Sequence, residues 1–468
     1  MTTPLFPQDT IAAIATPPGQ GGIAIIRVSG PGALDVAERV FRPGRGHVRH
    51  FRGYTLHYGT LIDPHDASTL DDGLLAIFRA PRSYTGEDMA ELSCHGGQAV
   101  TARVLQAALD AGARLANPGE FTLRAFLNGR MDLAQAEAVC DLIRARTEAS
   151  RRLARHQLEG HLSQALQHIR EELIGILAAI EVTIDFSDEV GELDYTALET
   201  RIQRTRQHIE HLLATADRGR ILREGLRVTL AGRPNVGKSS LLNALLRAER
   251  AIVTSVPGTT RDVIEESAQL NGILMVLTDT AGLRETDDVV ERIGVHRTRE
   301  TIARSDIILF VYDATAGWTA EDHATLNSIL ACQEAPEWLL IRNKCDLLPD
   351  PLPRAQPDPP ALPARPLHHI SVSARTGEGL SDLEQALCAY ARTTSPDSVV
   401  IANARHQQAL QQAHNSLTHA LHTTQQQLPG DFIAIDVRGA LDAVGQITGE
   451  TVTEEIIHRI FQDFCVGK

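Results

Sequence analysis

The chain has 468 residues, a length that predicts two to four domains, each large enough to bury a core of its own. Apolar residues make up 43% and charged residues 22%, a composition that excludes wholesale disorder and fibrous folds. Lys and Arg number 45 against 59 Asp and Glu, and the net charge of −14 opposes indiscriminate binding to nucleic acid or anionic lipid. Any contact with RNA is therefore expected from a local basic patch.

Cysteine usage and hydropathy indicate the cellular setting. Six scattered cysteines without a C-x-x-C pair predict neither a zinc ribbon nor a disulfide framework, and a reduced cytoplasm is expected. Apolar stretches fall far short of the roughly 18 residues of a spanning helix, and no Lys or Arg precedes Arg27. We expect neither a membrane span nor a signal peptide.

Residues 1–118 alternate short β-like runs with Gly and Pro, at 11–15, 23–28, 74–78 and 90–93, which predicts an α+β domain. Residues 119–220 are rich in Ala, Leu, Arg and Gln and predict helices. One of these is expected to open with a capping box formed by Asp132 and Gln135.

From 221 to 392, strand-like runs at 226–230, 273–277, 307–312, 338–341 and 370–372 alternate with helical stretches, the pattern of a doubly wound α/β domain. The proline-dense residues 348–366 are expected to form a loop. Residues 393–468 again predict helices. The sequence thus predicts a multidomain protein in which a P-loop α/β domain is inserted into a discontinuous all-α helical domain.

A phosphate-binding motif follows the first strand of the inserted domain. Gly232 to Ser239 reads G-x-x-x-x-G-K-S between a predicted strand and a predicted helix. Glycines allow backbone amides to close around phosphates, Lys238 supplies a charge for the β and γ oxygens, and the Ser239 hydroxyl suits Mg²⁺. Asp279-Thr280-Ala281-Gly282 ends a later strand, where a carboxylate can hold Mg²⁺ and a glycine amide can sense the γ-phosphate.

Two further motifs predict recognition of guanine. Asn343-Lys344-Cys345-Asp346 and Ser373-Ala374-Arg375 follow the next strands. The Asp346 carboxylate can accept from guanine N1–H and the 2-amino group, whereas adenine would leave it unpaired at a cost of about 1–3 kcal/mol. The predicted GTP-binding residues are Asn235, Val236, Gly237, Lys238, Ser239, Ser240, Thr254, Ser255, Val256, Pro257, Gly258, Thr259, Thr260, Asp279, Thr280, Ala281, Gly282, Asn343, Lys344, Asp346, Ser373, Ala374 and Arg375.

The residue after Gly282 is Leu283, whose alkyl side chain cannot orient an attacking water. Another group must do so. The polar loop at 253–262 offers Thr260 as a second Mg²⁺ ligand beside Ser239, and its carbonyl groups could hold a monovalent cation near the phosphates together with Asn235.

The combination of motifs resembles the tRNA modification GTPase family MnmE/TrmE along essentially the whole chain. The matching stretches include residues 10–30, Tyr84-Thr85-Gly86-Glu87-Asp88, His95-Gly96-Gly97, Pro118-Gly119-Glu120-Phe121, residues 124–128, 132–138 and 279–294, and Phe464-Cys465-Val466-Gly467-Lys468. The P-loop and residues 258–262 are shared with ribosome-assembly GTPases of the Era and Der types, but the flanking stretches are not.

The resemblance implies a homodimer held by an N-terminal tetrahydrofolate-binding domain at 1–118. It also implies an FAD-containing partner, a heterotetramer with it, and addition of an aminomethyl or carboxymethylaminomethyl group to C5 of the wobble uridine of certain tRNAs. The one-carbon unit would come from 5,10-methylene- or 5-formyl-tetrahydrofolate. Dimerisation of the G domains would make GTP hydrolysis K⁺-dependent.

The resemblance also implies roles for single residues. Asn235, Thr254, Val256 and Thr259 occupy the K⁺ positions, and Glu291 the position that orients the hydrolytic water. The implied folate-binding residues are Arg27, Glu91, Arg130 and Lys468, although position 130 is a lysine in the family pattern. Cys465 is a candidate catalytic residue because the family directs its closing motif toward the folate site.

Alternatives remain open at this point. A ribosome-assembly GTPase would need a basic KH-like region near the end of the chain, which the sequence does not show, and a pure GTP-dependent switch would not explain the N-terminal domain or Cys465. For RNA contact, two arginine clusters are candidates: Arg144, Arg146, Arg151, Arg152 and Arg155, and Arg218, Arg220, Arg223 and Arg227. The first cluster could equally be a solvated helix face whose charge is balanced by Glu148 and Glu159.

Overall fold

The computed structural model describes residues 9–248, 265–279, 300–331, 336–348, 359, 362, 364–391, 399–462 and 464–468. The chain forms two compact units. The first comprises Met1–Cys140, Gln157–Ile202 and Asn415–Lys468, and the second comprises Asp141–His156 and Gln203–His414.

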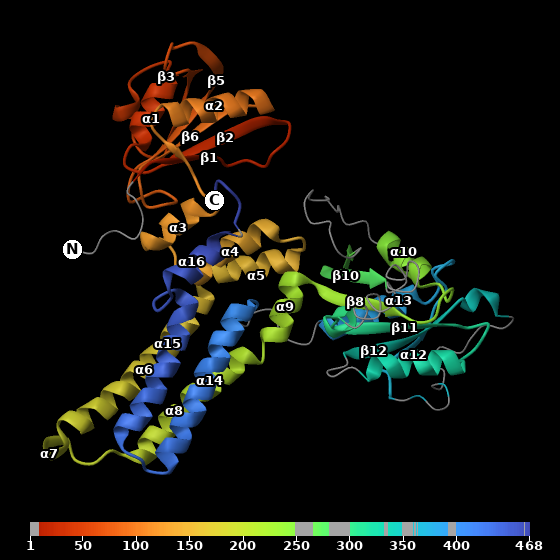
Figure 1. The fold of residues 1–468 in the computed structure, drawn as a ribbon. Helices are drawn as coiled ribbons and strands as arrows, with labels where there is room; N and C mark the ends of the chain where they lie inside the picture. The colour runs from red at the N-terminus through yellow and green to blue at the C-terminus, as the bar shows by residue number, and fades with distance from the viewer. Residues whose placement is uncertain are drawn as a thin grey trace, which may run out of the picture. The chain divides into compact units, whose positions relative to one another are not determined.

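The first unit contains a seven-stranded sheet with the strand order β3-β4-β5-β6-β2-β1-β7 (Figure 1). Neighbouring strands are antiparallel, except that β1 and β7 are parallel. The four runs predicted for this region are confirmed as β1, β2, β5 and β6, while β3, β4 and β7 were not predicted. The strands are β1 (Ile11–Ile14), β2 (Gly21–Ser29), β3 (Phe41–Pro43), β4 (Thr55–Ile62), β5 (Thr69–Phe78), β6 (Met89–Gly96) and β7 (Arg114–Leu115).

Helices α1 (Ala33–Val40) and α2 (Gln98–Asp110) cover one face of this sheet. Ile26, Leu75 and Leu92 of the strands are fully buried in one cluster with Val36 and Val104 of the helices. Successive side chains of a strand point to opposite faces, so their neighbours in each strand lie on the face away from α1 and α2. This second face is called the outer face.

Helices from both sides of the inserted domain pack together, as predicted. In the first unit α15 packs along α6, and α16 contacts α3. The predicted capping box is also present, because the Gln135 amide donates to Asp132 Oδ1 at 2.8 Å and the Asp132 amide donates to Gln135 Oε1 at 3.0 Å. The helices are α3 (Glu120–Leu127), α4 (Leu133–Arg144), α5 (Glu148–Leu158), α6 (His161–Asp185), α7 (Ser187–Val190), α8 (Tyr195–Leu213), α9 (Ala216–Glu224), α14 (Ala404–Gln425), α15 (Gly430–Thr448) and α16 (Glu454–Gln462).

The second unit contains a six-stranded sheet with the order β13-β12-β11-β8-β10-β9, in which only β9 is antiparallel to its neighbour. All five predicted runs are confirmed, and β9 was not predicted. Its elements are β8 (Leu226–Ala231), α10 (Lys238–Ala248), β9 (Glu265–Leu270), β10 (Ile273–Asp279), β11 (Ile307–Asp313), α12 (Ala320–Leu330), β12 (Glu337–Asn343), β13 (His369–Ser371) and α13 (Leu380–Ala391).

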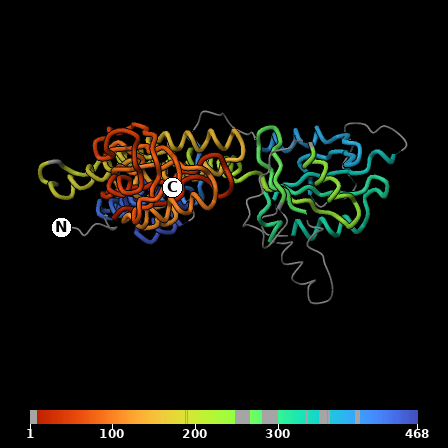
Figure 2. The backbone as a smooth tube through the Cα atoms, turned by 90° about the horizontal axis from the view of Figure 1, so that it is seen from above, coloured from red at the N-terminus to blue at the C-terminus, as the bar shows by residue number. Residues whose placement is uncertain are grey.

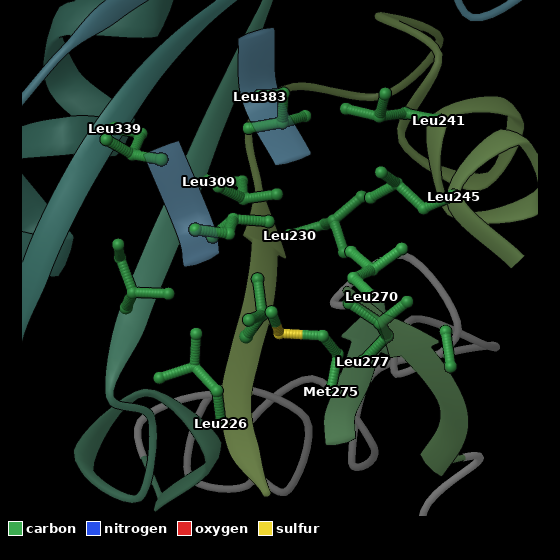
Figure 3. Close-up of a cluster of buried hydrophobic side chains, with 14 of the residues drawn as sticks. Leu226, Leu230, Leu241, Leu245, Leu270, Met275, Leu277, Leu309, Leu339 and Leu383 are labelled. Atoms are coloured by element: carbon green, nitrogen blue, oxygen red, sulfur yellow. The ribbon is translucent and has the colours of Figure 1, made fainter. Parts of the chain in front are cut away.

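Strand β8 lies in the middle of this sheet and is buried along most of its length. Figure 3 shows Leu230 of β8 among Leu309 of β11 and Leu241 and Leu245 of α10, all fully buried. This packing fixes the end of β8, from which the P-loop departs. In the described part of the chain, no helix is long and apolar enough to cross a membrane.

Candidate functional site

The P-loop, residues 232–237, connects β8 to α10, and its backbone requires glycine at both ends. The φ angles of Gly232 and Gly237 are 137° and 96°, values that side-chain-bearing residues rarely adopt. A Cβ atom on Gly232 would stand 2.2 Å from the carbonyl oxygen of Val311, and one on Gly237 would stand 2.3 Å from Asn343 Nδ2. The loop is therefore shaped by close approach to β11 and to the end of β12.

Three polar side chains of the kinds that bind phosphate and metal ions lie beside this loop. The side chain of Lys238 is 5% exposed, and its Nζ donates to the carbonyl oxygens of Gly232 at 2.9 Å and Arg233 at 2.8 Å. Ser239 Oγ donates to Asp279 Oδ2 at 2.7 Å. A hydroxyl and a carboxylate this close form an all-oxygen donor set, which fits Mg²⁺.

Asn343 joins the guanine motif to the P-loop. It is 1% exposed; its Nδ2 donates to the carbonyl oxygen of Val236 at 2.9 Å, and its Oδ1 accepts from the Ala374 amide at 3.1 Å. Lys344 follows with a φ of 67°, and its Nζ donates to the carbonyl oxygen of Asn235 at 2.8 Å. The two predicted base-recognition motifs and the P-loop thus form one hydrogen-bonded group.

The Asp346 carboxylate is held from both sides. Its Oδ1 accepts from Ser373 Oγ at 2.7 Å, and its Oδ2 pairs with Arg375 Nε at 3.0 Å. Such contacts hold the carboxylate in one orientation. Cys345, between the two motif residues, donates from Sγ to the carbonyl oxygen of Arg342 at 3.2 Å, and burial raises the pKa of its thiol.

Two acidic residues beside the P-loop were not predicted from the sequence. Asp313, at the end of β11, accepts from Lys344 Nζ at 2.6 Å; burial raises its pKa, but hydrogen bonds from Lys344 and Thr315 outweigh this and lower it to about 2. Asp322, fully buried in α12, accepts from Nε of the P-loop residue Arg233 at 2.7 Å. Asp313 is the last residue of β11 and Asp322 lies in the first turn of the helix that follows, and this position at the carboxyl end of a parallel strand is the signal that could have found them.

Part of the predicted GTP, Mg²⁺ and K⁺ site lies outside the described residues, namely Thr254, Ser255, Val256, Pro257, Gly258, Thr259, Thr260, Thr280, Ala281, Gly282 and Glu291. Asn235 and Ser240 are exposed at the P-loop and the start of α10.

Three of the four predicted folate-binding residues lie together in the first unit. Arg27 of β2 and Glu91 of β6 are direct partners across the strands, with Arg27 Nη2 and Glu91 Oε1 2.8 Å apart. Arg27 Nη1 also donates to the carbonyl oxygen of Gly467 at 3.2 Å, and Lys468 Nζ lies 5.6 Å from the centre of the Tyr84 ring. Burial, reinforced by the charge of Arg27, lowers the pKa of Lys468.

The segment Phe464–Lys468, called the tail, is held against the N-terminal part of the chain, as the position of the C end in Figures 1 and 2 illustrates. The Gly119 amide donates to the carbonyl oxygen of Cys465 at 3.3 Å, while the Cys465 side chain is exposed. The fourth residue, Arg130, is exposed and lies over Gly86, where a Cβ would stand 3.3 Å from its Cγ. Gly467 and Tyr84 are contacts that the sequence did not predict as site residues.

Many arginines proposed for RNA contact have acidic partners within the chain. Glu148 pairs with Nε of both Arg151 and Arg152, at 2.7 and 2.8 Å. In the second cluster, Arg220 pairs with Asp306, Arg223 with Asp141 and Arg227 with Glu224. The charge available to phosphate groups is correspondingly smaller than the sequence indicates.

The chain is similar to known proteins along its full length. Residues 10–130 match the N-terminal domain of the GTP-binding protein TrmE, and residues 133–465 match the MnmE helical domain. The tRNA modification GTPase MnmE of Moorella thermoacetica is 47% identical over 98% of this chain and 100% of its own length. The protein of the same name from Carboxydothermus hydrogenoformans is 47% identical over the same shares.

Among solved structures, the G domain of the T. maritima FeoB iron transporter is 25% identical and covers 36% of this chain and 98% of its own, with a TM-score of 0.24. The family assignment depends on the full-length relatives and on the two matched domains. The chain belongs to the MnmE family of tRNA modification GTPases.

Proposed function

We propose that this GTP hydrolase of the tRNA modification family works as a K⁺-stimulated homodimer with an FAD-containing partner. Together they would install an aminomethyl or carboxymethylaminomethyl group at C5 of the wobble uridine, position 34, of certain tRNAs. The one-carbon unit would come from tetrahydrofolate. Because both matched domains belong to the tRNA modification family, we propose neither a ribosome-assembly GTPase nor a pure switch.

The observation that carries the GTPase part is the hydrogen-bonded group at the carboxyl ends of the parallel strands. Lys238 is positioned for the phosphates, the pair of Ser239 and Asp279 for Mg²⁺, and Asp346 for guanine. When bound there, Mg²⁺ neutralises charge on the β and γ phosphates. The residues of the chain would bind the nucleotide and orient it for hydrolysis, and Ser239 and Asp279 would be the side chains that hold the metal.

Support for the K⁺ part comes from the P-loop residue Asn235. Its φ of 62° is unusual for a residue with a side chain, and Lys344 holds its carbonyl oxygen at 2.8 Å. Its exposed side chain is therefore presented at a fixed point of the loop. Thr254, Val256 and Thr259 as further K⁺ ligands, and Glu291 as the residue that orients water, stay predictions of the sequence.

Support for the folate part comes from Arg27, Glu91 and Lys468. A pterin offers paired N–H donors that suit a carboxylate, and a glutamate tail suits cations. The side chains of Arg27 and Glu91 are 13% and 18% exposed, so their charges lie in partly desolvated surroundings, where they act more strongly than at an open surface. The donor set therefore fits a folate. Arg130 and Cys465 remain candidates at its margin.

Support for the homodimer comes from apolar side chains on the outer face of the N-terminal sheet. Ile23, Tyr54, Leu56 and Tyr58 are 61 to 67% exposed. The register of β4, β5, β6 and β2 places Leu56 in the same row, on the same face, as Glu91 and Arg27. A second copy seated on this face would cover these four apolar side chains and lie beside the proposed folate site.

The test is mass spectrometry of tRNA nucleosides from a strain that lacks the gene. We expect the modified wobble uridine to disappear, to return with the wild-type gene, and to stay absent with Lys238→Ala. An Arg365→Ala gene, which changes a cation elsewhere in the inserted domain, serves as the matched control and should restore the modification. An unchanged wobble uridine in the deletion strain would refute the proposed function.

A further inference from the structure

Six large apolar side chains are exposed at one end of the helices of the first unit. This end, residues 181–200 and 425–436, is called the helix tip, and Figure 1 shows α7 there. Such side chains are expected to lie inside a protein unless a partner covers them. They are Val182, Ile184, Phe186, Leu428, Phe432 and Ile435, which are 39 to 64% exposed.

Contacts between the helices show that the chain segments carrying these side chains meet at one end of the first unit. A Cβ atom on Gly430, the first residue of α15, would stand 3.4 Å from Ile184 Cδ1 of α6. Tyr195, at the start of α8, donates from its hydroxyl to the carbonyl oxygen of Leu428 at 3.2 Å. The ends of α6 and α15 and the start of α8 therefore meet at the helix tip.

Carboxylates predominate around this apolar surface, although one of them, Glu181, pairs with Arg438 of α15. Residues 181–200 contain seven Asp and Glu, and residues 425–436 contain two, with no Lys or Arg in either segment. Such a surface repels RNA phosphates, anionic lipid and a second copy of itself. It is complementary to a protein surface in which Lys and Arg surround an apolar centre.

The charge of the rest of the chain indicates which kind of protein would carry such a complementary surface. The net charge is −14, and Asp141, Glu148, Glu224 and Asp306 pair with arginines of both basic clusters. A complex that binds tRNA through phosphate contacts must then draw many of its cations from the other subunit. A tRNA-binding partner of this chain is therefore expected to be basic.

We propose that the helix tip is the surface on which the FAD-containing partner docks, through an apolar patch ringed by Lys and Arg. This inference rests on the proposed function, which supplies the partner. Phe432 and Ile435 act as the apolar anchors, and the carboxylates of α7 and its flanks steer the basic surface toward them.

The first test measures the affinity of the purified full chain for the purified FAD-containing partner by calorimetry. Phe432→Ala/Ile435→Ala should weaken binding by tenfold or more, because buried anchors of an interface carry most of its binding energy. Ile174→Ala is the matched control, since Ile174 lies on α6, is 41% exposed and stands ten residues before Ile184. The GTPase rate without the partner and the circular dichroism spectrum should be unchanged in all variants.

The second test reverses charge. Asp188→Lys/Glu189→Lys should slow association with the partner and flatten its dependence on salt, whereas Asp217→Lys/Asp382→Lys, with the same change in net charge elsewhere, should not. A wild-type chain that does not bind the partner would overturn the proposed function. Binding by the wild type that the tip variants leave unchanged would overturn this inference alone. A tip variant that alters binding of tRNA without the partner would also overturn it, in favour of an RNA contact.

Discussion

The contact between the tail and the N-terminal sheet can be broken by one added methyl group. Gly467 has a φ of 99°, and a Cβ there would stand 2.4 Å from the carbonyl oxygen of Ile14. The carbonyl oxygen is a backbone atom and the added Cβ is bonded directly to the backbone, so no side-chain rotation relieves the collision. We expect Gly467→Ala to displace the tail and with it Lys468.

The size of the effect follows from what is lost. A side chain at positive φ costs about 1–2 kcal/mol, and loss of the hydrogen bond from the Arg27 guanidinium to Gly467 costs about 1.5–3 kcal/mol. At 1.4 kcal/mol for each tenfold change in affinity, even about 2 kcal/mol weakens a ligand that needs the docked tail by about thirtyfold. GTP hydrolysis should be unchanged, because Gly467 and the P-loop belong to different compact units.

The assay is calorimetry with 5-formyl-tetrahydrofolate, together with hydrogen exchange of the Gly119 amide, which donates to the tail at Cys465. Gly112→Ala is the matched control, since Gly112 has a φ of 111° and nothing within 4 Å of an added Cβ. It carries the backbone strain without the collision. Unchanged folate affinity and unchanged exchange at Gly119 in Gly467→Ala would refute the reasoning.

Three further predictions concern the nucleotide site. We expect faster GTP hydrolysis in KCl than in NaCl and loss of that difference in Asn235→Ala; equal wild-type rates in both salts would contradict the K⁺ proposal. Asn343→Ala removes two buried hydrogen bonds worth about 1–3 kcal/mol, so titration with a fluorescent guanine nucleotide should show about 5- to 150-fold weaker binding, and unchanged affinity would contradict the linking role. The pKa of Asp313 is lowered from 3.8 to about 2 in the folded chain, so its pairing with Lys344 stabilises the fold above pH 4 and loses that effect as pH falls toward 2. Urea unfolding should show Asp313→Asn about 1–2 kcal/mol less stable at pH 7 and closer to wild type at pH 3, and an equal difference at both values would exclude this pair as the cause.

The described part of the nucleotide site was predictable because its motifs follow parallel strands. Runs of Val, Ile and Leu indicated β8, β10, β11 and β12, and the carboxyl ends of neighbouring parallel strands share one edge of a sheet. The P-loop, Asp279 and Asn343 were therefore expected at the same edge of the sheet. Asp313 escaped notice because Asp313-Ala314-Thr315 matches no motif, and only the register of β11 beside β12 brings it to Lys344.

Long-range pairing was not predictable from local pattern. Strand β4 was missed because Leu56 and Tyr58 are exposed while Gly59 and Leu61 are buried, so hydropathy does not mark an inner face. The arginines of α9 looked available because Asp141 and Asp306, which pair with Arg223 and Arg220, lie about 80 residues away. The exact boundaries predicted at 118, 220 and 392 stay predictions, as does the loop at 348–366, most of which lies outside the described ranges.

The hydrogen bond between Arg27 and Gly467 joins residues 440 positions apart. At the usual 5–20 residues per second, a ribosome needs roughly 20 to 90 s to travel between them. During that time β2 and β6 can pair while Arg27 awaits the tail, and the inserted domain emerges in between. The contacts of Arg27 with the tail can therefore form only after residue 467 has been made, so a newly made chain can acquire its nucleotide site well before it can hold the ligand proposed for Arg27, Glu91 and Lys468.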